Sequence, residues 1–132
     1  MRKILVVALL FFLAACGEEV AVQTNELQQN TAIQQEIERK LKEDDAITKA
    51  NIISVNNEWL ISYQMKPLEK WGKKKHLNSL KKSIEKIDSS QKFSVSNDYK
   101  LFIESEKLLD VRDEKKVKDK LKELKKLMEE ET

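Results

Sequence analysis

The residue with the clearest capacity for chemistry is Cys16, the only thiol of the chain. It closes an unbroken apolar run from Ile4 to Leu13, which follows the basic pair Arg2 and Lys3. A short basic end, an apolar run and small residues are the layout of an export signal. The ten apolar residues at about 1.5 Å each cover only about half of the roughly 30 Å hydrocarbon core, so the run is too short to be a membrane span.

The segment Leu13-Ala14-Ala15-Cys16 resembles the lipobox of bacterial lipoproteins. In that family the cysteine thiol receives a diacylglyceryl group, and signal peptidase II cuts directly before the cysteine. The resemblance implies that residues 1–15 are a signal peptide, that Cys16 is lipidated, and that the chain is anchored on the outer face of the cell membrane. The alternative is ordinary secretion with a cut near Ala15, which leaves a free thiol.

Charge and composition exclude several classes of protein. Removal of residues 1–15 takes two basic residues away and leaves 23 basic against 23 acidic residues, so global charge gives no support for a nucleic-acid partner. No second cysteine is available to form a disulfide with Cys16. Two glycines and one proline argue against an all-β fold and against a glycine-rich phosphate loop.

The other residues that could do chemistry are sparse. His76 is the only histidine, whereas a zinc site usually needs several histidine or cysteine ligands, so we interpret it as a solvated helix residue. The acidic clusters Asp44-Asp45 and 129–131 lack the alternating ligands and central glycine of a calcium loop. We therefore expect no catalytic residue, no metal and no cofactor. The alternative, a hydrolase of the cell envelope, needs two convergent carboxylates or a nucleophile facing a cleft.

A lysine-rich segment, Lys70-Trp71-Gly72-Lys73-Lys74-Lys75, is the most prominent stretch that we expect to be exposed. An aromatic side chain beside lysines suits the surface of an anionic bilayer, where each lysine contributes about 1 kcal/mol. Lys70, Trp71, Lys73, Lys74 and Lys75 are therefore candidate contacts for a membrane or for another polyanion, such as an acidic wall polymer. The alternative is a solvated helix start with Trp71 packed on the preceding hairpin.

The spacing of apolar residues predicts the elements that position these side chains. Residues 16–30 are polar without a sustained period and predict a lipidated cysteine followed by a flexible tether. Seven elements follow, assigned from four-residue spacing, from β-branched runs and from the breaks between them. They are a helix (31–43), two hairpin strands (47–55 and 59–65), a helix (73–88), a strand (93–96) and two helices (99–109 and from 113).

The order α-β-β-α-β-α-α predicts a small α+β sandwich of two layers. We expect a three-stranded sheet, made of the hairpin plus one strand, with helices packed on one face. The domain is placed at residues 31–110, followed by a charged amphipathic helix over 111–132. The apolar stripe of that helix either packs within the domain or binds a protein partner or a second copy, and it consists of Val117, Leu121, Leu124 and Met128.

Three parts of the domain carry a further resemblance: residues 46–55 (Ala-Ile-Thr-Lys-Ala-Asn-Ile-Ile-Ser-Val), the lysine-rich second helix, and residues 93–98 (Phe-Ser-Val-Ser-Asn-Asp). Together with the hairpin they resemble the YhcN/YlaJ-type sporulation lipoproteins of endospore-forming bacteria. The element order is also similar to the BON domain, a small module linked to phospholipid or membrane surfaces.

The resemblance implies a non-enzymatic lipoprotein of the forespore or spore membrane, with a binding or structural role in spore formation or germination. The alternative is a general cell-envelope lipoprotein, unrelated to sporulation, that binds anionic lipid, wall polymer or a protein partner.

Overall fold

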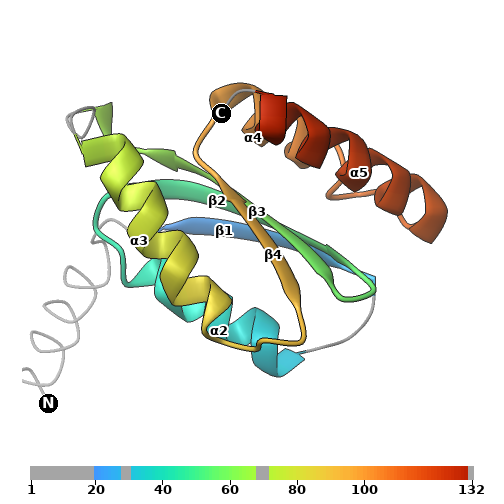
Figure 1. Ribbon diagram of the computed structural model, residues 1–132, viewed down its shortest axis with the longest axis horizontal. Coiled ribbons are helices and arrows are strands. Elements are labelled where there is room, and N and C mark those ends of the chain that lie inside the picture. Colours follow the sequence, from blue (N-terminus) through green and yellow to red (C-terminus); the bar gives the residue numbers. More distant parts are fainter. Residues whose placement is uncertain (1–19, 28–30, 68–71, 131–132) are drawn as a thin grey trace, which may run out of the picture.

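The computed structural model describes residues 20–27, 31–67 and 72–130, which form one sheet with helices on both of its sides (Figure 1). In chain order the elements are β1 (Ala21–Glu26), α2 (Thr31–Lys42), β2 (Ile47–Val55), β3 (Glu58–Met65), α3 (Lys73–Glu85), β4 (Lys92–Ser96), α4 (Tyr99–Glu106) and α5 (Glu114–Glu130). The predicted α+β class is confirmed. Within the described ranges, no helix combines the length and the apolar character needed to cross a membrane.

Two β-α-β units joined by a hairpin make up the sheet, whose strand order is β1-β2-β3-β4. β1 and β2 are parallel and are connected by α2, while β3 and β4 are parallel and are connected by α3. The predicted hairpin is confirmed, since β2 and β3 are antiparallel and pair Val55 with Glu58. Its turn places Asn56 at φ 56°, the left-handed region that asparagine tolerates better than most residues.

The predicted three-stranded sheet is wrong, because a fourth strand, β1, lies inside the predicted tether 16–30. β1 pairs with β2 along its whole length and forms one edge of the sheet. An edge strand can expose polar side chains, as Gln23 does here, while Val20 and Val22 pack against the core. The strand is therefore stabilised by pairing with distant residues and needs no apolar run of its own.

Helices cover both faces of the sheet, so the prediction of helices on one face in two layers is also wrong (Figure 1). α2 and α3 pack over a first core, which includes Ile37 and Ile84, and α4 and α5 belong to a second core. Neighbouring residues of β2 supply the two cores, with Ile52 in the first and Ile53 in the second. Side chains of a strand alternate between faces, so consecutive buried residues require cover on both sides.

The apolar stripe of α5 belongs to the second core. Val117, Leu121 and Leu124 are fully buried there, and Met128 is partly buried. The stripe thus packs within the domain, as in the first of the two alternatives that the sequence left open.

Candidate functional site

The lysine-rich segment begins α3, close to the end of the sheet where β3 stops (Figure 1). Lys73, Lys74 and Lys75 are all exposed on the first turn, whereas Lys70 and Trp71 lie outside the described residues. α3 has no acidic residue in its first turn and no side-chain cap. A helix N-terminus carries partial positive charge, so lysines there are unfavourable by some tenths of a kcal/mol each. The three lysines therefore do not stabilise the start of this helix.

The predicted lipidation residue Cys16 and the lipobox residues Leu13, Ala14 and Ala15 lie outside the described residues. Val20, only four residues after Cys16, is buried and packs in the first core. The folded part of the chain therefore begins much closer to Cys16 than the predicted tether allowed.

His76 is not the solvated residue that the sequence suggested. Its Nε2 lies 2.7 Å from Oδ2 of Asp44, its Nδ1 lies 2.9 Å from the hydroxyl oxygen of Tyr63, and its side chain is 18% exposed. A neutral ring satisfies both contacts when Nε2–H donates to the carboxylate and the tyrosine hydroxyl donates to Nδ1. Because the three residues come from the α2–β2 connection, β3 and α3, these bonds tie the first turn of α3 to the rest of the fold.

A carboxylate, an imidazole and a hydroxyl in sequence are also the parts of a site that activates a nucleophile. Here the hydroxyl belongs to Tyr63, which is fully buried. Burial, with a smaller contribution from the negative charge of Asp44, raises the pKa of Tyr63 to about 12. The raised pKa keeps the phenol protonated, and burial keeps it away from solvent, so the arrangement fits a structural role.

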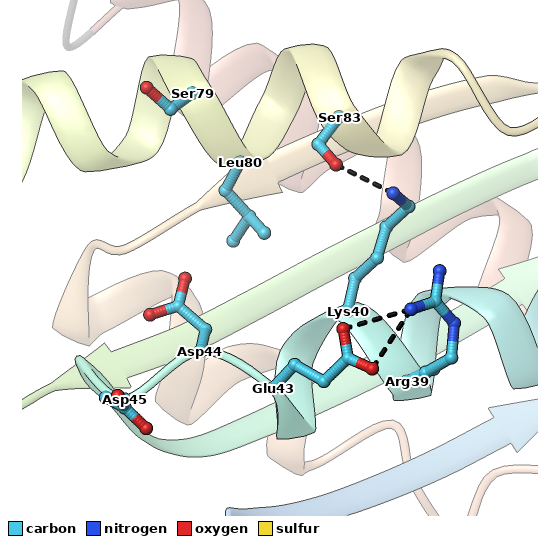
Figure 2. Close-up of a pocket in the computed structure, with 8 residues that line it drawn as sticks. All are labelled: Arg39, Lys40, Glu43, Asp44, Asp45, Ser79, Leu80 and Ser83. Carbon is cyan, nitrogen blue, oxygen red and sulfur yellow. Dashed lines mark hydrogen bonds and ion pairs between the residues drawn. The ribbon is translucent and has the colours of Figure 1, made fainter.

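A groove of about 440 Å³ lies between α2 and α3 (Figure 2). It is lined by Arg39, Lys40, Glu43, Asp44, Asp45, Ser79, Leu80 and Ser83. Nζ of Lys40 donates to Oγ of Ser83 at 2.8 Å, and Arg39 donates to both carboxylate oxygens of Glu43 at 3.0 Å. Four of the eight lining side chains therefore pair with one another.

Asp44 and Asp45 do not form a convergent pair of carboxylates (Figure 2). In Figure 2 the carboxylates of Asp44 and Asp45 point in different directions, and Asp44 is bonded to His76. The second cluster, 129–131, lies at the end of α5 and is described only as far as Glu130. Among residues 20–27, 31–67 and 72–130 there is no group of three or more histidine, cysteine, aspartate or glutamate residues able to hold a metal ion.

A buried polar cluster that the sequence analysis missed holds α4 against the sheet. Nδ2 of Asn51 lies 3.3 Å from Oγ of Ser105, which donates to the carbonyl oxygen of Phe102 at 2.8 Å and is also hydrogen-bonded to Ser62. The available signal was a polar residue in an apolar position, since Asn51 interrupts a β-branched run. The cluster is closed to solvent and serves packing.

Of the candidate contact residues, the structure brings Lys73, Lys74 and Lys75 together on one exposed turn. This turn is fixed to the domain through the bonds of His76. Comparison with known proteins found no matching family model, no matching curated protein and no matching solved structure.

Proposed function

We propose that the mature chain is a lipoprotein, held on the outer face of the cell membrane by a diacylglyceryl group on Cys16. Its α+β domain has a non-enzymatic, binding or structural role in spore formation or germination. The observation that carries the anchor is the segment Leu13-Ala14-Ala15-Cys16 behind a basic end and an apolar run. One acyl chain binds membranes only marginally, whereas the two chains of a diacylglyceryl group anchor stably. The spore-related role is supported by the resemblance of residues 46–55 and 93–98.

The contacts of His76 support a non-enzymatic role. Both of its ring nitrogens are engaged by Asp44 and Tyr63, and the tyrosine hydroxyl is buried. The groove between α2 and α3 offers side chains that are already paired, such as Arg39 with Glu43. A wall hydrolase needs two convergent carboxylates, and Asp44 and Asp45 do not provide them (Figure 2).

The anchor is tested by a Cys16→Ser substitution in the bacterium that encodes the chain, followed by palmitate labelling and membrane fractionation. We expect the wild type to carry the label and to remain with membranes at high salt, and the variant to lose both. A matched control combines Cys16→Ser with Ser90→Cys, which restores a thiol at an exposed position of the domain. Label in this control, or membrane retention of the Cys16→Ser chain at high salt, contradicts the anchor.

The role in sporulation is tested separately, with a deletion strain and with antibodies against the domain. We expect the protein to accumulate in forespore or spore membranes, and the deletion to change spore yield or germination rate. A lipid-labelled protein with constant abundance, and a deletion without a spore phenotype, favour the general cell-envelope lipoprotein instead.

A further inference from the structure

β1 brings the domain close to its proposed lipid anchor. Only Gly17, Glu18 and Glu19 separate Cys16 from Val20, which is buried in the first core. A fully extended chain spans at most about 3.5 Å per residue, so Val20 lies within about 14 Å of the lipidated residue. The end of the sheet at which β1 begins must therefore lie near the bilayer.

The register of the sheet shows which strands end there. Ala21 pairs with Lys49, near the start of β2, and Lys49 in turn pairs with Gln64, near the end of β3. Neighbouring strands are about 4.8 Å apart, so Gln64 lies roughly 10 Å from Ala21. β4 runs parallel to β3 and also ends on this side, where Ser96 pairs with Ser62.

The starts of α3 and α4 lie at the same end, because each helix follows a strand that stops there. Asn97 joins them, since its Nδ2 donates to the carbonyl oxygen of Lys73 at 3.1 Å and its chain neighbours lead into α4. Tyr99, the first residue of α4, is 65% exposed. Among the described residues, it is the one large hydrophobic side chain that is exposed. We call this region the basic end and define it by the exposed residues Lys49, Lys73, Lys74, Lys75, Tyr99 and Lys100.

Two acidic groups at the basic end are engaged. Asp44 is bonded to His76, and Asp98 caps α4 by accepting from the backbone N–H of Leu101 at 3.0 Å. The exposed Asp45, with Glu18 and Glu19 of the linker, opposes five exposed lysines, so the balance at this end is positive although the mature chain is neutral.

We propose that the basic end docks on the anionic phospholipid headgroups of the bilayer that carries the anchor, with the ring of Tyr99 at headgroup level. The proximity of the surface rests on the proposed lipidation of Cys16. A lipid anchor combined with a basic patch is a sufficient pair of signals for stable membrane attachment. Docking fixes the orientation of the domain, so that the hairpin turn at Asn56 points away from the membrane.

The size of the effect follows from the lysines. Each lysine near an anionic surface multiplies the partition coefficient by about five, so neutralising three of them lowers it about 100-fold. The effect is lost beyond a Debye length, about 8 Å at physiological salt. The far end of α3 supplies a control, because Lys81, Lys82 and Lys86 are also exposed, and Lys86, directly after the helix, lies about 20 Å along its axis from Lys73.

The first experiment removes the anchor and measures the surface alone. The mature chain, residues 16–132 with Cys16→Ser and therefore without the apolar run of the signal, is mixed with vesicles of phosphatidylglycerol and phosphatidylcholine, or of phosphatidylcholine alone, and its partition is measured by sedimentation. Lys73→Gln/Lys74→Gln/Lys75→Gln should weaken binding to the anionic vesicles about 100-fold, and Lys81→Gln/Lys82→Gln/Lys86→Gln less than about fivefold. The proposal is overturned if the two variants lose binding equally, if the chain binds both kinds of vesicle equally, or if it binds neither. Binding of a wall polymer to the same lysines would not rescue it.

The second experiment measures orientation in the lipidated chain. Since the Cys16 thiol is blocked by lipid, a thiol introduced elsewhere can be labelled with a single aromatic fluorophore. Two variants are compared: Tyr99→Cys in the basic end, and Ser90→Cys in the α3–β4 connection at the opposite end. Quenching by nitroxide lipids should be stronger at position 99 than at position 90. This difference should appear only with anionic vesicles, and it should vanish when Lys73, Lys74 and Lys75 are replaced by glutamine. A chain that floats with vesicles without this difference keeps the anchor and overturns docking. A chain that does not float, but whose Cys16→Ser form shows the lysine dependence, loses the anchor and keeps the docking surface.

Discussion

Truncation of Leu121 tests whether α5 is an integral part of the folded domain. Leu121 is fully buried in the second core. Burying a leucine side chain is worth about 1.5–3 kcal/mol, and the cavity left by truncation raises the cost of a leucine-to-alanine substitution to roughly 2–5 kcal/mol. We expect Leu121→Ala to lower the free energy of unfolding by about 3 kcal/mol, a large share of the roughly 5–15 kcal/mol of a typical domain.

The assay is urea unfolding of the mature chain with Cys16→Ser and Trp71→Phe, which leaves Trp59 as its tryptophan, followed by tryptophan fluorescence and by far-UV circular dichroism. Trp59 is buried in the first core, on the face of the sheet opposite α5, so its signal reports unfolding of the whole domain. With a slope of about 1.5 kcal/mol per molar urea, a loss of about 3 kcal/mol moves the midpoint down by about 2 M. Lys122→Ala is the matched control, because its side chain is exposed on the same turn, and its effect should stay within about 0.5 kcal/mol.

One result refutes this reasoning directly. If Leu121→Ala lowers the helical signal while the midpoint of the Trp59 transition stays unchanged, α5 unfolds independently of the sheet. Its apolar stripe is then available to a partner, which is the alternative that the sequence left open.

Two further predictions concern buried polar groups. Because the folded chain holds Tyr63 protonated up to a pKa of about 12 while the unfolded chain loses this proton near pH 10, stability should fall as the pH rises from 10 to about 12. Tyr63→Phe should remove this pH-dependent loss of stability. If the urea midpoint falls equally with pH in the Tyr63→Phe chain and in the chain with Tyr63, the prediction is contradicted. Ser105→Ala leaves buried polar atoms of Asn51 and Ser62 without this partner, and should cost about 1–3 kcal/mol by urea unfolding, against no measurable change for the exposed Ser89→Ala.

Elements with a local signal were predictable from the sequence. The hairpin followed from two β-branched or aromatic runs around Asn56. The start of α4 also has a local signal, because Asp98 is a favoured N-cap residue and its side chain accepts from the backbone N–H of Leu101. β1 has no such signal beyond the alternation of Val20 and Val22, because its stability comes from pairing with β2, more than twenty residues away. Its polar side chains are accommodated in two ways: Gln23 is exposed at the edge, whereas the buried Asn25 donates from Nδ2 to the carbonyl oxygens of Leu108 at 2.7 Å and Val111 at 2.8 Å.

Contacts between distant residues explain the other misses. The environment of His76 depends on Tyr63 and Asp44, which lie 13 and 32 residues away in sequence, so no local pattern identifies it as a strut. Cover on both faces of the sheet could have been inferred, because Ile52 and Ile53 are consecutive and apolar within one strand. The lysines of α3 were visible in the sequence, but their place at the β1 end of the sheet depends on the topology.

The position of β1 also changes what an anchor on Cys16 would do. A tether over residues 17–30 could extend to roughly 50 Å and would let the domain search a wide zone above the membrane. With β1 starting at Ala21, the linker to Val20 spans at most about 14 Å, which is less than the length of the neighbouring helix α3. Partners that require long reach, such as outer layers of a wall, therefore fit poorly. A short linker favours ligands at the membrane surface, because it holds the lysines of α3 at high local concentration there.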